Sequence, residues 1–315
     1  MKRKAVIFGI KGTKLTSEER SFLKDIKPWG IILFSRNIKN FNQVKSLTTE
    51  IKYILKDKNY PIIIDEEGGK VSRLGKILNL GFFSQSLFGK LYELDKKNFY
   101  NYYEVYISKV CSTLRKLRIN INTVPVLDVR RQNSHDIIGS RSYSNDPEIV
   151  SKIGQICINL FKKYKIATVT KHIPGHGLSK KDSHYHLPVV KEKKAILTKN
   201  DFKPFKKCKS FFSMTAHIVY SSYDPVFPAT HSKVVIKKVI RKHIGFKGIL
   251  ISDDISMKAL NYNLKENATR ALEAGCNLIL HCNGNIKEMK KLANIVPPID
   301  MFTKKKTSLF YKFLG

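Results

Sequence analysis

The sequence has few acidic residues, few cysteines and no long apolar run, and each shortage excludes a class of protein. Only 25 of its 315 residues are Asp or Glu, against 58 Lys and Arg, so the formal net charge is +33. The five cysteines are odd in number and show no Cys-x-x-Cys spacing, which excludes a disulfide framework and a zinc knuckle and fits a reducing compartment. No apolar run approaches the length of a membrane span, so we expect no membrane association.

The amino terminus has the charge of an export signal but not its length. The basic segment 2–4 precedes an apolar run at 5–10, which Lys11 ends. We therefore expect a soluble protein that stays in the cytoplasm.

The positive charge by itself would favour a nucleic-acid partner, because polyanions are bound through neutralised phosphates. However, the basic residues are 47 Lys and only 11 Arg, spread from Lys2 to Lys312. Arg is the residue that makes bidentate contacts with bases and phosphates. A dispersed excess of Lys is typical of a solvated surface, so we predict no nucleic-acid partner and expect a monomer.

Eight short apolar runs alternate with stretches of helical pattern along the chain. The predicted strands are residues 5–10, 29–34, 61–65, 121–127, 167–171, 211–217, 248–253 and 277–282. The predicted helices are residues 17–27, 42–56, 97–118, 146–164, 200–209, 233–243 and 264–274. The segment Thr16-Ser-Glu-Glu19 has the spacing of a capping box, and Gly245 and Gly275 stand where helices would end.

Strands that are apolar throughout and alternate with helices predict a parallel sheet covered by helices. Eight such units in about 300 residues fit an α/β (β/α)₈ barrel, the TIM-barrel fold, better than an open sheet. No Gly-x-Gly-x-x-Gly follows the first strand, which argues against a dinucleotide-binding fold. We predict one catalytic domain over residues 1–315, with a short tail after about residue 298 that packs as a final helix.

Polar and ionisable residues follow nearly every predicted strand, at the end of the barrel where active sites form. They are Asp65 with Arg73, Asp128 with Arg141 in the loop after it, Lys171 with His172, His217, Asp253 with Asp254, and His281. Buried ionisable groups are costly unless they are paired or functional. The pattern therefore predicts an active site at this rim.

The histidines of the segment 171–177 do not form a zinc site of the helical type. His172 and His176 are four residues apart, but Pro174 and Gly175 interrupt a helix and no Glu follows the first His. We predict no metal and no cofactor, and we interpret His176 as a loop histidine that stabilises the turn.

Asp182 and His184, two residues apart, could form a dyad in which the carboxylate orients the imidazole and stabilises its protonated form. The alternative is a solvated Asp and His in a surface loop. For Asp253 the open roles are nucleophile, metal ligand or helix cap. Asp254 is the natural cap, which would leave Asp253 free to point into the barrel mouth.

The motifs, taken in order, closely resemble those of family 3 of the glycoside hydrolases, in particular its single-domain bacterial β-N-acetylglucosaminidases. The resemblance rests on Lys171-His-Ile-Pro-Gly-His-Gly177 with Asp182-Ser-His184, Ile64-Asp-Glu-Glu-Gly-Gly69, Ala216-His-Ile-Val-Tyr220 and Ser252-Asp-Asp-Ile-Ser-Met257. It extends through most of the chain.

The resemblance implies catalytic roles for Asp253 as the nucleophile, His184 as the general acid/base and Asp182 as its support. It also implies that five residues bind the sugar: Asp65, Arg73, Arg141, Lys171 and His172. The implied reaction is retaining hydrolysis of terminal β-linked N-acetylglucosamine, here from 1,6-anhydro-N-acetylmuramoyl fragments during cytoplasmic peptidoglycan recycling. The implied partner is thus a peptidoglycan-derived oligosaccharide or muropeptide.

The chain departs from the family pattern at two positions near this site. Glu66 stands where close relatives usually carry Gln, which would add a carboxylate near the sugar, and Gly9 stands where many carry Asp. Three alternative functions stay open: a β-N-acetylglucosaminide phosphorylase, a β-glycosidase for another sugar, and a basic binding protein without catalytic activity.

Overall fold

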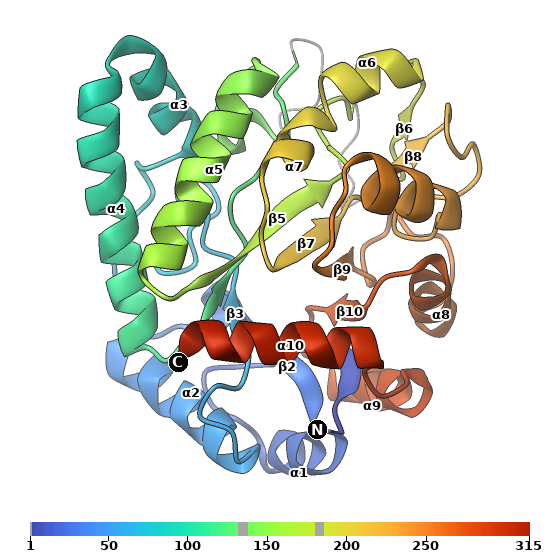
Figure 1. Cartoon of the computed structure of the whole chain (residues 1–315). Coiled ribbons are helices and arrows are strands. Elements are labelled where there is room, and N and C mark those ends of the chain that lie inside the picture. The colour runs from blue at the N-terminus through green and yellow to red at the C-terminus, as the bar shows by residue number, and fades with distance from the viewer. Residues whose placement is uncertain (1, 132–137, 180–185) are drawn as a thin grey trace.

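The computed structural model describes residues 2–131, 138–179 and 186–315. Eight parallel strands close into a barrel, in which each strand pairs with the barrel strands before and after it in the chain (Figure 1). These strands are β1 (Lys4–Gly9), β2 (Pro28–Leu33), β3 (Ile62–Ile64), β4 (Ile121–Asn122), β5 (Ala167–Ile173), β7 (Phe212–Thr215), β9 (Ile249–Asp254) and β10 (Leu278–His281). The predicted (β/α)₈ barrel is confirmed, and each observed strand overlaps its predicted range.

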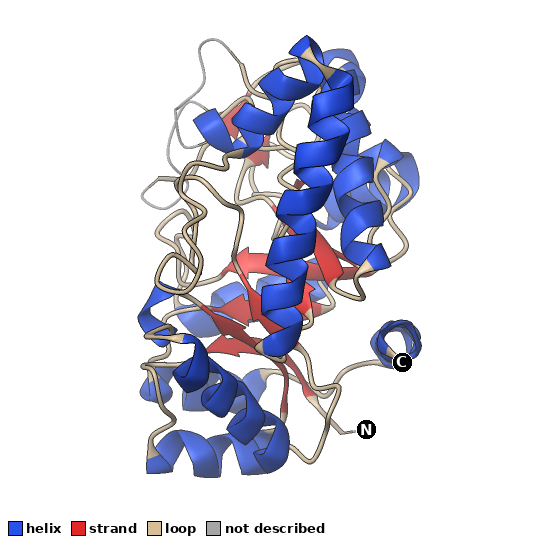
Figure 2. Cartoon of the chain, turned by 90° about the vertical axis from the view of Figure 1, so that its left-hand side faces the viewer, coloured by secondary structure: helices blue, strands red, loops and turns tan. Residues whose placement is uncertain are grey.

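The strands are apolar because both of their faces are covered. All six residues of β2 and all three of β3 are buried, and Ile31 of β2 lies opposite Ile62 of β3. Figure 2 shows the strands inside a layer of helices. The prediction for β4 is too long, since Pro125 lacks the N–H that a continued ladder needs, and beyond it a single bridge joins Val126 to Lys171.

Most predicted helices are present, with shifts of one to three residues at their ends. The α-helices are α1 (Ser17–Ile26), α2 (Phe41–Ile54), α3 (Gln85–Leu94), α4 (Lys96–Lys116), α5 (Pro147–Lys163), α6 (Lys194–Lys199), α7 (Lys203–Lys207), α8 (Leu264–Ala274), α9 (Ile286–Ile295) and α10 (Met301–Leu314). The segment predicted as a helix at 233–243 is wound as a π-helix, η3 (Val235–His243). Three helices, α3, α6 and α9, lie outside every predicted range, and α7 is shorter than its predicted range.

Local sequence signals set several of these boundaries. Thr16 and Glu19 form the predicted capping box at the start of α1. Gly275 ends α8 with a φ of 118°, a conformation that L side chains rarely adopt. Two strands also fall outside the predictions: β6 (Val189–Val190) and β8 (Val219–Tyr220), which form a small separate sheet.

The carboxyl-terminal segment packs as a helix, as predicted, and covers one end of the barrel. The Trp29 indole N–H donates to Thr307 Oγ1 of α10 at 2.9 Å, and the ring of Phe310 lies 5.4 Å from that of Phe212. Because Trp29 and Phe212 stand at the amino ends of β2 and β7, α10 closes the amino-terminal end. The carboxyl ends of the strands remain available for a site.

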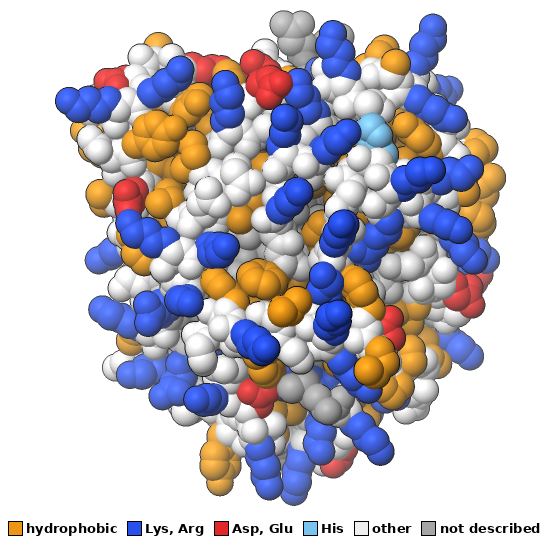
Figure 3. Space-filling view, in the orientation of Figure 1, with side chains coloured by type: hydrophobic (Ala, Val, Ile, Leu, Met, Phe, Trp, Pro, Cys, Tyr) orange, Lys and Arg blue, Asp and Glu red, His pale blue; other side chains and the backbone are white. Residues whose placement is uncertain are grey.

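The surface agrees with the interpretation of the charge as dispersed. Lys and Arg side chains are scattered over the face shown in Figure 3, with apolar and uncharged side chains between them. Among the described residues, no helix is both long and apolar enough to cross a membrane.

Candidate active site

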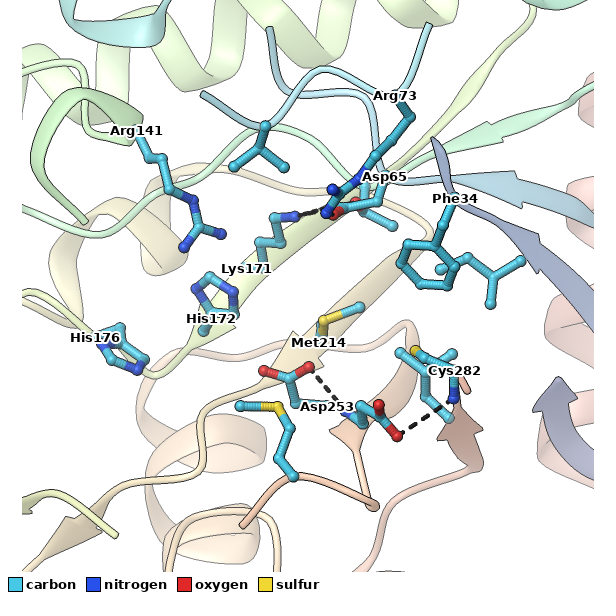
Figure 4. A pocket seen from close by; sticks show the side chains of 16 residues that line it. Phe34, Asp65, Arg73, Arg141, Lys171, His172, His176, Met214, Asp253 and Cys282 are labelled. Carbon is cyan, nitrogen blue, oxygen red and sulfur yellow. Dashed lines mark hydrogen bonds and ion pairs between the residues drawn. The ribbon is translucent and has the colours of Figure 1, made fainter. Parts of the chain in front are cut away.

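The carboxyl ends of the barrel strands open onto a cavity of about 190 Å³ (Figure 4). Its walls include six of the eight site residues predicted from the sequence: Asp65, Arg73, Arg141, Lys171, His172 and Asp253. The other two, Asp182 and His184, lie outside the described residues. Apolar side chains, among them Phe34 and Met214, complete the lining.

A chain of ion pairs crosses one wall of the cavity. Asp65 accepts from Arg73 Nη2 and from Lys171 Nζ, each at 2.6 Å, and from Thr123 Oγ1 at 2.5 Å. Burial alone would raise the pKa of Asp65, but Lys171 and Arg73 outweigh it and hold the pKa well below its usual range. Asp65 is therefore an ionised carboxylate with its donors already in place.

Glu67 extends this network, although it is not among the site residues predicted from the sequence. Its carboxylate accepts from Arg141 Nε and Nη2 at 2.8 Å each and pairs with Lys171 Nζ at 2.5 Å. Burial favours the neutral carboxyl, yet Arg141 and Lys171 lower the pKa of Glu67. The only local signal was three consecutive acids after an apolar strand, which does not show which of them meets a cation.

Glu66, by contrast, is not among the residues that line the cavity, although it contacts the backbone of Arg73, which does line it. Its oxygens accept from the backbone N–H groups of Gly68 at 3.0 Å and of Arg73 and Leu74 at 2.7 Å. Burial raises the pKa of Glu66. Glu66 therefore stabilises the turn that carries Arg73.

A buried aspartate orients His172. Asp128 is fully buried and its Oδ2 lies 2.7 Å from His172 Nδ1. Burial would raise the pKa of Asp128, but His172 lowers it, so the carboxylate is ionised and the imidazole must donate from Nδ1. This leaves Nε2 of His172 as the ring nitrogen available on the cavity side.

His176 stabilises the turn, as expected, and also lines the cavity. Its backbone N–H donates to Asp128 Oδ1 at 2.7 Å, which stabilises the turn as predicted. Its ring also lines the cavity, 5.5 Å from the ring of His172. Burial and the neighbouring His172 lower the pKa of His176 to about 4, so it is neutral near pH 7.

Asp253 and Asp254 divide their roles at the end of β9. Asp254 Oδ1 accepts from the backbone N–H of Ser256 at 3.1 Å and so caps a turn, although no helix follows directly. Asp253 faces the cavity near His172 (Figure 4). Burial would raise the pKa of Asp253, but His217 and His172 outweigh it and lower the pKa, which keeps this carboxylate ionised.

The glycine at position 9 lies against the backbone carbonyl of Cys282 and the guanidinium of Arg36. Arg36 Nε donates to the carbonyl of Ile10 at 3.0 Å, and its Nη2 donates to the carbonyl of Cys282. A Cβ at Gly9 would lie 2.8 Å from that Nη2 and would clash with the Cys282 carbonyl. In this chain, therefore, the Cys282 carbonyl, to which Arg36 donates, occupies the space that a side chain at position 9 would need.

In the part of the chain that the structure describes, no three His, Cys, Asp or Glu side chains form a group that could hold a metal ion. The cavity instead presents ionised carboxylates beside fixed cationic and imidazole donors. These groups hydrogen-bond hydroxyl groups well, and an ionised carboxylate can act as a nucleophile. The barrel and this cavity together are typical of the glycosidases built on (β/α)₈ barrels.

Comparison with known proteins identifies the family. The model of the glycosyl hydrolase family 3 N-terminal domain matches residues 3–305. A β-hexosaminidase from Neisseria meningitidis serogroup C is 34% identical over 290 residues, which cover 89% of this chain and 78% of that protein. The chain therefore belongs to glycosyl hydrolase family 3, and it is a glycoside hydrolase.

Solved structures support the same assignment. NagZ from Neisseria gonorrhoeae, in complex with N-trifluoroacetyl-D-glucosamine, is similar with a TM-score of 0.85 and 30% identity, over 98% of this chain and 90% of that one. A family 3 β-N-acetylglucosaminidase from Paenibacillus sp. has a TM-score of 0.86 and 28% identity, again over 98% of this chain. The present chain spans 60% of that longer protein.

Proposed function

We propose that this glycoside hydrolase is a retaining exo-β-N-acetylglucosaminidase in which Asp253 is the nucleophile. The observation that carries the proposal is the ionised Asp253 carboxylate in a cavity whose other polar groups are held by ion pairs and by Asp128. Relatives named β-hexosaminidase and the neighbour with bound N-trifluoroacetyl-D-glucosamine support this sugar class.

In the proposed first step, an oxygen of Asp253 attacks the anomeric carbon while a proton passes to the leaving oxygen, which gives a covalent glycosyl-enzyme. Water then attacks the anomeric carbon from the face that the leaving group occupied and displaces the Asp253 carboxylate, so the β configuration is retained. The resemblance assigns the proton transfers to His184, supported by Asp182. An imidazole with an ordinary pKa near roughly 6.5 suits both proton delivery and activation of water.

The polar wall would hold the sugar during both steps. Asp65 can accept hydrogen bonds from sugar hydroxyls, and Arg73, Arg141 and Lys171 can donate them. His172, oriented by Asp128, offers one further ring nitrogen. Since these groups are paired with one another before the sugar arrives, little reorganisation is needed on binding.

The natural substrate proposed here is a 1,6-anhydro-N-acetylmuramoyl fragment that carries terminal N-acetylglucosamine, cleaved in the cytoplasm during peptidoglycan recycling. The proposed enzyme acts as a monomer and needs no cofactor. A panel of aryl β-glycosides and purified anhydro-muropeptides would establish the preferred sugar and aglycone. The same assays in phosphate buffer would reveal any sugar 1-phosphate formed by phosphorolysis.

The decisive variant is Asp253→Asn. It should abolish release of the aryl group from an aryl β-N-acetylglucosaminide while the protein stays folded, and NMR of the wild-type product should show the β anomer first. Asp300→Asn, which alters the cap of α10 at the far end of the barrel, is the matched control and should keep its activity. Turnover by Asp253→Asn at the wild-type rate would refute the assignment.

The role of His184 is tested by the leaving group. His184→Ala should slow the hydrolysis of substrates with poor leaving groups far more than that of activated aryl glycosides, because only the former need protonation. Equal losses on both kinds of substrate would remove His184 as the acid.

A further inference from the structure

Glu67 stands behind the cavity wall and contacts two residues that form it. Its side chain is 1% exposed and does not line the cavity. Through Oε1 and Oε2 it holds the planar guanidinium of Arg141, and through Oε1 it also holds the ammonium of Lys171. Glu67 can therefore influence a bound ligand only through these two neighbours.

The contact with Arg141 is a fork of two hydrogen bonds, which fixes the plane of the guanidinium as well as its position. Arg141 is the last residue of a three-residue 3₁₀ helix, η2 (Gly139–Arg141), and no strand or long helix carries it. A side chain on such a segment needs an anchor outside its own element to keep one orientation. Glu67, which follows β3 and is well buried, supplies that anchor.

The contact with Lys171 makes Glu67 one member of an alternating series of charges. Along the wall the order is Arg73, Asp65, Lys171, Glu67 and Arg141, each in an ion pair with the next. Lys171 and Arg141 both approach Glu67 Oε1, so two positive charges are held close together by one negative charge. Without the charge on Glu67, the two cations would repel each other in a site of low dielectric.

We infer that Glu67 is a positioning residue that fixes Arg141 and Lys171 in the geometry with which they bind the sugar. The inference rests on the proposed function only for the identity of that sugar. Asp65 is the acceptor that faces the cavity. Glu67 is the second carboxylate, and it holds Lys171 and Arg141 at a fixed distance from each other. The two acids therefore differ in role although they lie two residues apart.

The chain offers a closely matched control in Glu66. It is the next residue along, it is equally buried, and its partners are backbone N–H groups and Ser72. Glu67→Gln should lower kcat/KM for an aryl β-N-acetylglucosaminide about 100-fold, the size of effect expected when binding groups are misplaced by about 1 Å. Glu66→Gln should keep activity within a few-fold of the wild type.

A double-mutant cycle separates positioning from a general structural effect. If Glu67 acts through Arg141, Glu67→Gln should cost much less activity in an Arg141→Ala background than in the wild type. If Glu67→Gln reduces activity by the same factor in both backgrounds, the inference is overturned. Equal activities for Glu67→Gln and Glu66→Gln would also overturn it.

An NMR measurement tests the same point without any substrate. The Nε–H signal of Arg141, assigned by its loss in Arg141→Lys, should shift or broaden in Glu67→Gln and stay in place in Glu66→Gln. An unchanged signal in Glu67→Gln would overturn the inference. A wild-type protein that fails to hydrolyse N-acetylglucosaminides would instead refute the proposed function, while this NMR result still decides the role of Glu67.

Discussion

Replacing Lys171 with methionine tests the ion-pair network at its centre. Lys171 is 3% exposed, and its Nζ lies 2.6 Å from Asp65 and 2.5 Å from Glu67. Methionine has about the same length and no charge, so Lys171→Met would leave both carboxylates buried without the cation between them. Breaking a buried ion pair by removing one partner costs about 3–5 kcal/mol.

This cost corresponds to a clear fall in melting temperature. A chain of this size loses about 2 °C in Tm for each kcal/mol, so Lys171→Met should melt about 6–10 °C below the wild type at pH 7. Scanning calorimetry would measure the difference. Activity towards an aryl β-N-acetylglucosaminide should fall in parallel, since Lys171 would no longer connect the Arg73–Asp65 ion pair with the Glu67–Arg141 ion pair.

Lys163→Met is the matched control. Lys163 Nζ also lies 2.5 Å from a glutamate, Glu104, but the lysine is 61% exposed. Exposed ion pairs contribute little because water screens them, so the Tm should be nearly unchanged. Equal Tm values for the two variants would refute the argument that burial, and not bond length, decides the contribution of these pairs.

The difference in Tm between the wild type and Lys171→Met should depend on pH. Lys171 is among the groups that hold the pKa values of Asp65 and Glu67 below their ordinary values. Carboxyls of this kind contribute stability above an unfolded-state pKa of about 4, and that stability is lost as the pH falls through the folded-state pKa. The Tm difference between the wild type and Lys171→Met should therefore narrow below about pH 4, and a widening gap would contradict the assignment.

Two further predictions concern buried aspartates near the cavity. Asp128→Asn should lower kcat/KM about 100-fold with the fold retained, because the amide no longer fixes His172 as a donor from Nδ1; a folded variant within twofold of the wild type would contradict this. Burial raises the pKa of Asp201 to about 6, so the folded protein favours the protonated carboxyl. The stability that this protonation contributes is complete below an unfolded-state pKa of about 4 and is lost as the pH rises through about 6. Asp201→Asn should therefore raise the Tm at pH 8 by up to about 6 °C, equivalent to about 3 kcal/mol, and should make little difference below pH 4. A lower Tm for Asp201→Asn at pH 8 would show that its ion pair with Arg131 outweighs the cost of burial.

Most of the barrel could be predicted from local patterns. Strands buried on both faces must be apolar throughout, and eight of them alternating with amphipathic helices leave few possible topologies. The helices that were not predicted are short: α3 and α9 have 10 residues each, although Ser84 and Asn285 cap them in the usual way. Six of the eight residues predicted for the site line one cavity, because the carboxyl ends of parallel strands meet at one rim and the residues at and after those ends converge.

The sequence by itself determined the barrel, the rim of ionisable residues and, through its motifs, the family resemblance. Only the tertiary structure distinguished Glu66 from Glu67, two adjacent acids with the same chemistry. One accepts from backbone groups within eight residues, while the other pairs with Lys171 and Arg141, which are far away in the chain. Periodicity records which side of a strand or helix is buried, because burial depends on near neighbours. The partner of a buried charge depends on which distant segments the closed barrel brings together, and no local pattern contains that information.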